Sequence, residues 1–265
     1  MLYHGPMGQP ISPWSWDALA PSERLWATLS AVGLQAGSEH TQYLIKLELA
    51  QSNLVGLRLP QRDLEGADMR GARLDFADFR KAVVRRVRFA GAVMWRANLS
   101  WSSAEEADFE AAELEGADFT EATLTDAVFR EARLKSAILM RADASGANFE
   151  HAQLVGALAE SIDLGGANLR RAHCTGAAFP LANFSEADLR ETVLKRADLR
   201  GADLEGAQLE GALLEGARFG TAGAEELKSV LSERTVSEVP ARELLLAAKW
   251  ESIEIDGKTV RRDAL

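Results

Sequence analysis

The feature that most constrains the fold is a five-residue period that runs without insertion or deletion from residue 52 to about residue 222. With Leu54 as the centre of the first unit and Phe219 as the centre of the last, the segment holds 34 consecutive units, and Leu or Phe occupies 27 of the centres. Alanine stands two residues before the centre in 27 of the 34 units. A short period kept over so many residues predicts a stacked repeat fold.

A period of five matches neither the 3.6 residues per turn of an α-helix nor the two-residue alternation of a β-strand. The pattern is satisfied if each unit forms a short straight segment and then turns a corner. The central Leu or Phe and the Ala two residues earlier then point inward, while the other three residues face solvent. The spacing alone predicts this inward and outward sorting.

Units such as Ala67–Gly71 (Ala-Asp-Met-Arg-Gly) and Ala202–Gly206 (Ala-Asp-Leu-Glu-Gly) resemble those of the pentapeptide-repeat family. The resemblance covers about two thirds of the chain. It implies an all-β fold, a right-handed quadrilateral parallel β-helix in which four units complete one coil. At the strand spacing of ~4.8 Å, the units of residues 52–222 would form about 8.5 coils and a rod ~40 Å long, with short helical zones at both ends.

The inward positions predict a narrow core, in which Ala fits the corners and Leu or Phe fills the axis. Because one coil takes 20 residues, four phenylalanines fall on the same side of successive coils and should stack: Phe89, Phe109, Phe129 and Phe149. Asp or Asn precedes the centre in 15 units, where a short polar side chain can bond the backbone at the bend. Gly ends 13 units, where it tolerates turn geometries with positive φ.

Two non-repetitive zones flank the repeats. Residues 1–51 carry four prolines and three tryptophans, and Ser22 is a suitable N-cap for a helix that ends near Gly33. We expect this segment to be a partly helical N-terminal cap.

Residues 223–265 are expected to hold two amphipathic helices, at 224–231 and 241–250, separated by Pro240. The alternation of residues 252–261 around Asp256-Gly257 predicts a β-hairpin. Two roles are open for this zone. It caps the exposed edge of the last coil of a monomer, or it joins two copies in a C-terminally joined homodimer, as the family resemblance implies for DNA-mimicking members.

The composition excludes several classes of function. A net charge of −10, from 40 acidic and 30 basic residues, argues against direct binding to nucleic acid or to an anionic membrane. The first 15 residues lack the basic and apolar regions of a signal peptide, and no stretch is apolar enough to span a bilayer. We expect a cytoplasmic protein.

No residue pattern indicates catalysis, a cofactor or a metal site. The four histidines show no metal-ligand spacing, and the sequence has no glycine-rich phosphate loop or nucleophile elbow. Cys174, the single cysteine, occupies a repeat centre and is expected to be a buried apolar residue. The sequence therefore predicts a protein that is not an enzyme.

Assigning successive units to the four sides of a coil sorts the outward charges. The sides that begin with units centred at residues 54, 59 and 69 carry net charges of +2, +1 and −2, whereas the side that begins at Leu64 carries −8. We call this side the acidic face, and its acids are opposed only by Arg85 and Arg86. The acids are Asp63, Glu65, Glu105, Glu106, Asp126, Asp143, Asp163, Glu186, Asp203 and Glu205.

A line of carboxylates on a rigid rod is similar to duplex DNA, which presents one negative charge per ~1.7 Å of axis. Some members of the family that the chain resembles are DNA mimics that bind DNA gyrase. The resemblance thus implies a protein partner, DNA gyrase or topoisomerase IV, and a role in quinolone resistance. The absence of projecting loops and the long N-terminal segment depart from that pattern. The alternative is an acidic face that only keeps the rod soluble.

Trp95 and Trp101 occupy outward positions close together in the sequence. Exposed tryptophans are typical of interface hot spots, although the N-terminal segment is an alternative cover for them. They support a second class of function, a general interaction scaffold or secreted effector unrelated to topoisomerase, which engages partners through these tryptophans and the terminal zones.

Overall fold

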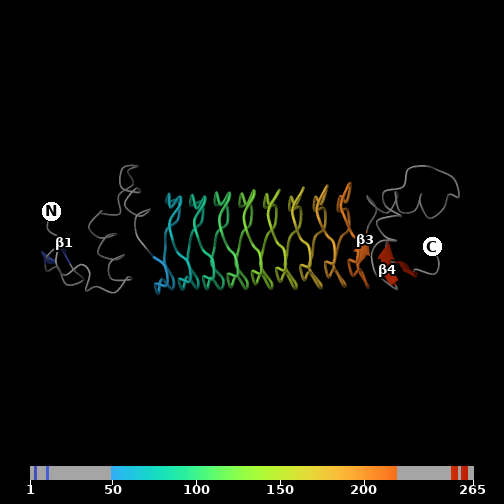
Figure 1. Ribbon diagram of the computed structural model, residues 1–265, viewed down its shortest axis with the longest axis horizontal. Coiled ribbons are helices and arrows are strands. Elements are labelled where there is room, and N and C mark those ends of the chain that lie inside the picture. Colours follow the sequence, from blue (N-terminus) through green and yellow to red (C-terminus); the bar gives the residue numbers. More distant parts are fainter. Residues whose placement is uncertain (1–2, 5–9, 12–48, 220–251, 256–257, 262–265) are drawn as a thin grey trace.

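The computed structural model describes residues 3–4, 10–11, 49–219, 252–255 and 258–261. Over residues 49–219 the chain forms a straight rod of stacked coils (Figure 1). Isolated parallel bridges join the residue before each centre to the residue 20 positions later, from Asn53–Arg73 to Asp198–Arg218. One coil therefore consists of four five-residue sides, and the predicted β-helix is confirmed.

The unit centred at Phe109 shows why the period is five. The Phe109 N–H donates to the carbonyl of Val128 in the next coil (2.7 Å), and the Ala112 N–H donates back to the Phe109 carbonyl (3.0 Å). The third residue of this tight turn, Ala111, has a φ of 53°, as type II turns require at that position. Each unit thus pairs with its neighbours and then changes direction.

The last residue of each described unit has a positive φ, between 52° and 74°. Gly occupies 13 of these corners, as expected, but other residues occupy 21. A side chain in this left-handed region costs ~1–2 kcal/mol, which hydrogen bonds between coils offset. At the Glu106 corner, for example, the N–H donates to the carbonyl of Thr125 (3.0 Å).

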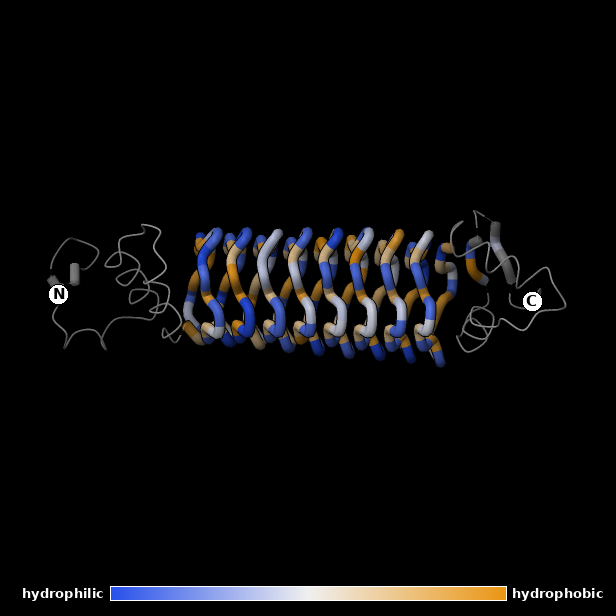
Figure 2. Tube along the Cα trace, turned by 90° about the horizontal axis from the view of Figure 1, so that it is seen from above, coloured by the Kyte–Doolittle hydropathy of each residue, from blue (hydrophilic) through white to orange (hydrophobic). Residues whose placement is uncertain are grey.

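The core lies along the axis of the rod. Ala117 and Phe119 are fully enclosed, and apolar and polar residues alternate along every coil (Figure 2). The four phenylalanines of the predicted ladder stack with ring centroids 5.1, 4.8 and 4.7 Å apart. Each enclosed ring contributes ~1.5–3 kcal/mol of burial, so the inward pattern accounts for the stability of the rod.

Both ends of the described rod add detail to the expected domain boundaries. Leu49 is buried and its N–H donates to the carbonyl of Asp68 (3.0 Å), so the coils begin one unit before Leu54. At the other end, β3 (Arg218–Phe219) pairs in parallel with β4 (Ser252–Ile255). The buried Ile253 joins the core, and β4 takes the place of a further coil on this side.

The predicted hairpin over residues 252–261 is confirmed, because β5 (Lys258–Arg261) pairs antiparallel with β4. Near the N-terminus, β1 (Tyr3–His4) pairs antiparallel with β2 (Pro10–Ile11). The expected helices of the two terminal zones lie outside the described residues.

Candidate partner-binding face

Stacking places the units of the acidic face in one straight column. Four of its acids precede their centres and belong to a single series of parallel bridges: Asp63, Asp143, Asp163 and Asp203. Three follow their centres: Glu65, Glu105 and Glu205. Three stand at corners with φ between 56° and 58°: Glu106, Asp126 and Glu186. All ten are half-buried or exposed, so the structure brings the predicted residues together on one side.

The aspartates before the centres also hold the bends of the coil. Asp143 Oδ1 accepts hydrogen bonds from the Ser145 N–H (3.1 Å) and hydroxyl (2.7 Å). Asp163 Oδ1 accepts from the Gly165 N–H (2.9 Å) and from the side-chain amide of Asn183 in the next coil (2.9 Å). These local bonds explain the preference for Asp or Asn at this position, and they fix the carboxylates without a cation.

The corner carboxylates extend along the rod over the following coil. A Cβ added at Gly146 would meet the Asp126 carboxylate, and one added at Gly206 would meet the Glu186 carboxylate. The two glycines thus leave room for the acids of the preceding coil, which lengthens the continuous negative surface.

Basic residues neutralise only the beginning of the acidic face. Glu65 forms ion pairs with both Arg85 and Arg86, and the hydrogen bond from Arg86 lowers the pKa of Glu65. From residue 103 to residue 206 the face carries eight acids and no Lys or Arg. None of the eight belongs to an ion pair among the described residues.

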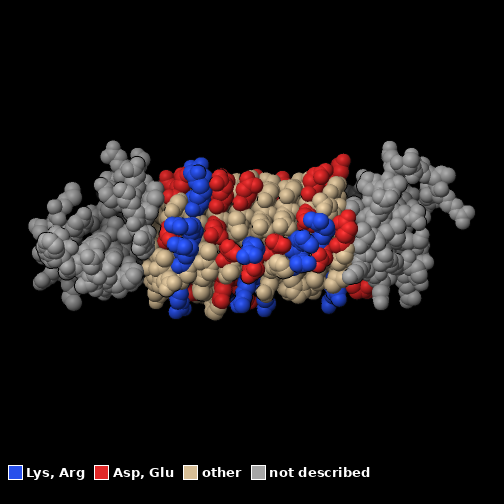
Figure 3. Space-filling model, viewed as in Figure 1, with Lys and Arg blue, Asp and Glu red and all other residues tan. Residues whose placement is uncertain are grey.

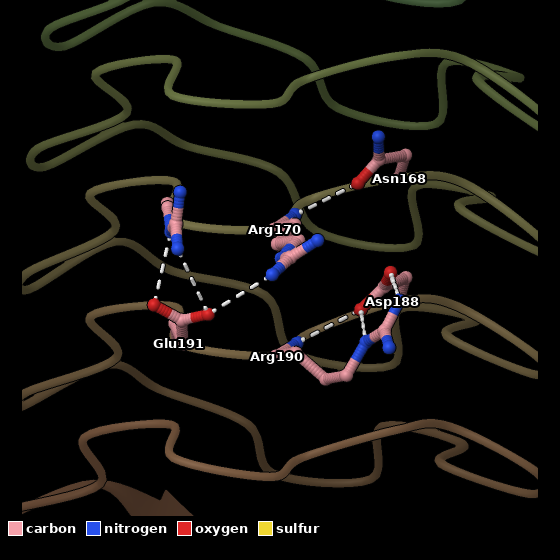
Figure 4. A network of polar contacts seen from close by, with 6 residues as sticks. Asn168, Arg170, Asp188, Arg190 and Glu191 are labelled. Atoms are coloured by element: carbon pink, nitrogen blue, oxygen red, sulfur yellow. Dashed lines mark hydrogen bonds and ion pairs between the residues drawn. The ribbon is translucent and has the colours of Figure 1, made fainter.

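The next side of the coil, which begins with the unit centred at Met69, arranges its charges differently, and we call it the paired face. Glu191 receives both Arg170 (3.2 Å) and Arg171 (2.9 Å), while Arg190 pairs with Asp188 (2.5 Å) in the same unit (Figure 4). The guanidinium of Arg190 lowers the pKa of Asp188. On the surface seen in Figure 3, groups of Lys and Arg also lie next to Asp and Glu.

Trp95 and Trp101 point outward as predicted, and each is 49% exposed. The Trp95 indole N–H donates to Glu113 (3.1 Å) and the Trp101 indole N–H donates to Glu121 (2.9 Å), so a carboxylate of the next coil orients each ring. The two rings lie on the other two sides of the coil and not on the acidic face.

Sequence reasoning missed a group of apolar side chains on the side that carries Trp101. Leu158 and Leu181 are 48% and 61% exposed. Leu158 also forms parallel bridges with Ile138 and Ala178 in the adjacent coils. Sorting the outward residues by hydropathy, as was done for charge, would have revealed this group.

The described residues hold no group of three or more His, Cys, Asp or Glu that could bind a metal ion. Burial raises the pKa of the Cys174 thiol to about 12, so it is protonated and unreactive at neutral pH. Within the same part of the chain, no helix has the length and apolar character of a membrane span.

The family described as pentapeptide repeats matches the chain in eight copies, over residues 48–86, 85–121, 122–158, 145–185 and 182–220. No curated protein matches the chain significantly.

Several solved structures are similar to the chain. HetL from Nostoc sp. strain PCC 7120, a pentapeptide repeat protein involved in heterocyst differentiation regulation, is 26% identical over 74% of this chain and 97% of its own, with a TM-score of 0.30. Rfr23 from Cyanothece 51142 is 19% identical over 66% of this chain and 94% of its own, with a TM-score of 0.31. Full-length QnrB1, a plasmid-mediated fluoroquinolone resistance protein, is 19% identical over 76% of this chain and 92% of its own, with a TM-score of 0.31.

The repeat matches together span residues 48–220, which is more than half of the chain. The coils of the structure cover the same stretch. The chain therefore belongs to the pentapeptide-repeat family, whose fold is a right-handed β-helix.

Proposed function

We propose that this protein is a non-catalytic recognition protein that binds a type II topoisomerase, DNA gyrase or topoisomerase IV, through its acidic face as a mimic of DNA. Such a partner places the protein in the cytoplasm. The observation that carries the proposal is the segregation of charge: eight carboxylates that form no ion pair among the described residues follow one another along one side of the rod, while the other sides mix acids with bases.

The spacing of these carboxylates suits a DNA-binding groove. From Glu105 to Glu205 the face advances by five coils, or ~24 Å at ~4.8 Å per coil. Eight charges over this length give one charge per ~3 Å, close to the ~3.4 Å between charges along one DNA strand. A basic groove that follows a DNA backbone would therefore meet a similar linear charge density.

The rigidity of the face supports the same function. Backbone hydrogen bonds of 2.5–3.0 Å join the coils along this side, so little conformational entropy is lost when a partner binds. A fixed line of like charges also accelerates association with an oppositely charged groove and makes it dependent on salt.

The experiment is a DNA supercoiling assay with purified gyrase, with and without a quinolone. We expect the protein to inhibit supercoiling or to relieve quinolone poisoning. Substituting four acids of the face by Lys should weaken this effect, so that the protein concentration needed for half of the maximal effect on gyrase rises at least about tenfold. The four substitutions are Glu105→Lys, Glu106→Lys, Asp126→Lys and Asp143→Lys. If the unsubstituted protein does neither, the topoisomerase proposal fails.

A matched variant separates the position of the charge from its amount. The same change in net charge, made on the other three sides, should alter the protein concentration needed for half of the maximal effect on gyrase by less than about threefold. The four substitutions are Glu115→Lys, Glu150→Lys, Glu160→Lys and Glu210→Lys. Equal losses in both variants would show a general charge effect and would contradict recognition by one face.

The second candidate is an interaction scaffold or secreted effector, and the exposed indoles of Trp95 and Trp101 favour it. In that case the double substitution Trp95→Ala and Trp101→Ala should abolish partner binding, while the four Lys substitutions on the acidic face change it little. Partner recovery from the native host with both variants distinguishes this candidate from topoisomerase binding.

A further inference from the structure

Three successive coils carry an apolar surface on the side that carries Trp101. We call this surface the apolar patch, and it consists of Ile138, Met140, Leu158, Ala178, Pro180 and Leu181. The remaining outward positions of these coils hold Arg141, Glu160 and Ser161, so only the column of residues 138, 158 and 178 is apolar in all three coils. Leu158 and Leu181 are the most exposed of the six, and the other four are half-buried. Parallel bridges place residues 138, 158 and 178 side by side, so the patch runs along the axis of the rod.

The coil itself does not require these side chains. Leu181 stands at a corner with a φ of 58°, a strained conformation for a bulky residue, and 61% of it is exposed. It lies over Gly201, where a Cβ would come within 2.7 Å of Leu181 Cδ2. An apolar residue that is both strained and exposed does not stabilise the fold, whereas contiguous exposed apolar surface is typical of binding sites.

The patch borders the unpaired part of the acidic face. In the same three coils, Asp143 follows Met140 by three residues, and Asp163 follows Leu158 by five. Arg141 stands at the corner between Met140 and Asp143, but its guanidinium pairs with Glu121 of the preceding coil (2.7 Å). Glu186 follows Leu181 by five residues and extends from the next corner. An apolar strip and an acidic strip therefore run parallel to each other and to the rod.

The backbone of these coils is not available to a partner. The Leu158 N–H donates to the carbonyl of Ala137 (2.9 Å), and its carbonyl accepts from the Leu139 N–H (2.7 Å). A partner strand could not add to this surface by backbone pairing. The fitting partner is one whose own backbone hydrogen bonds are already made, as in an α-helix.

We propose that the apolar patch and the carboxylates beside it form a docking surface for a basic amphipathic helix of a partner protein, lying parallel to the rod. One helical turn rises ~5.4 Å and one coil ~4.8 Å, so three turns follow three coils with a mismatch of only ~2 Å. Apolar residues at i, i+4 and i+7 would contact the patch, and one Lys or Arg per turn would face the acidic strip. This proposal does not require a topoisomerase partner, because a DNA mimic has no use for the patch.

The test is fluorescence anisotropy with the full-length protein and a labelled synthetic peptide. The peptide has 14 residues, with Leu on one face over three turns and Lys along one flank. We expect saturable binding with a Kd on the order of 10–100 μM. A peptide with Glu in place of Lys should bind at least about tenfold more weakly.

Two substitutions address the patch and leave every carboxylate in place. Leu158→Ser and Leu181→Asn should each weaken peptide binding at least about fivefold, and Asn tolerates the left-handed corner. The matched control is Phe76→Asn, at an equally exposed corner with the same φ of 58° on another side. It should leave the affinity unchanged.

The acidic strip is addressed by Asp143→Asn and Asp163→Asn, which retain the side-chain oxygen that accepts the local hydrogen bond, as Asn148 and Asn168 do in their units. Together they should reduce the affinity and its dependence on salt.

The proposal is overturned if no peptide binding is measured up to ~1 mM, or if Phe76→Asn weakens binding as much as Leu181→Asn. It is also overturned if sedimentation shows self-association that Leu181→Asn abolishes, because the occupant is then a second copy of this chain. The patch variants should still act on gyrase if the topoisomerase proposal holds, so the two proposals fail independently.

Discussion

The acidic face and the paired face are neighbouring sides of one coil, with the same corners and the same positions for Asp and Asn, but the paired face forms ion pairs along its length whereas the acidic face forms them only at its beginning. Among the described residues, seven ion pairs lie on the paired face, whereas the two on the acidic face both involve Glu65. Since the same backbone supports both arrangements, the coil does not depend on outward ion pairs. The fold therefore does not determine which charges occupy the outward positions, and acids can gather on one side without destabilising the coil.

The two sides also differ inside the rod. The paired face contributes the stacked rings of Phe89, Phe109, Phe129 and Phe149 at its centres, while the acidic face contributes smaller centres in the same coils. Those smaller centres include Ala104 and Ala144, and both are fully buried. The interior beneath the acidic face thus depends on volume supplied by its neighbour.

The largest expected effect tests this dependence. Phe129→Ala removes a ring that stacks on two others at 4.8 and 4.7 Å, and it should destabilise the rod by ~3–5 kcal/mol. Urea denaturation followed by circular dichroism measures the change. The matched substitution Phe76→Ala removes an exposed ring and should cost no more than ~0.5 kcal/mol. Similar costs for the two variants would contradict a shared core.

A smaller effect tests whether the corners of the two sides are equivalent. Gly166 on the acidic face and Gly211 on the paired face have φ values of 65° and 74°, and an added Cβ would meet no atom closer than 3.5 Å at either corner. Gly166→Ala and Gly211→Ala should each cost ~1 kcal/mol, because Ala is unfavourable at positive φ. Urea midpoints that differ strongly between the two variants would show that one side constrains its corners more than the other.

The inward half of this structure was predictable from the sequence because sterics decide it. A one-residue shift would expose Leu or Phe along the entire rod, so the period alone identifies the buried residues, and the 20-residue coil then predicts the phenylalanine ladder. Outward side chains are less constrained. Arg86 has acids within reach in both neighbouring coils, and spacing does not show that it pairs with Glu65 rather than Glu106.

Sequence spacing also does not determine the backbone conformation of the corners or the exact ends of the repeat. Positive φ at a residue such as Leu181 is set by hydrogen bonds between coils, which override the local preference for Gly. The inward position of Leu49 likewise depends on its bond to the following coil. Sorting the outward charges by side identified the acidic face, but the ion pairs that distinguish the paired face from it required coordinates.

The smallest expected effect concerns the pH dependence of an ion pair on the paired face. The hydrogen bond from Arg190 lowers the pKa of Asp188 below its ordinary value of 3.8, so the pair contributes stability that is fully present above pH ~4 and is lost as the pH falls through the lowered pKa. Arg190→Ala should raise the pKa of Asp188 toward 3.8, as measured by carboxyl NMR titration, and should leave the lowered pKa of Asp198 beside Arg200 in place. The effect on stability is small because both arginines are about half exposed. An unchanged Asp188 pKa in the variant would mean that Arg190 does not stabilise the carboxylate, and the two sides would differ less than their ion pairs suggest.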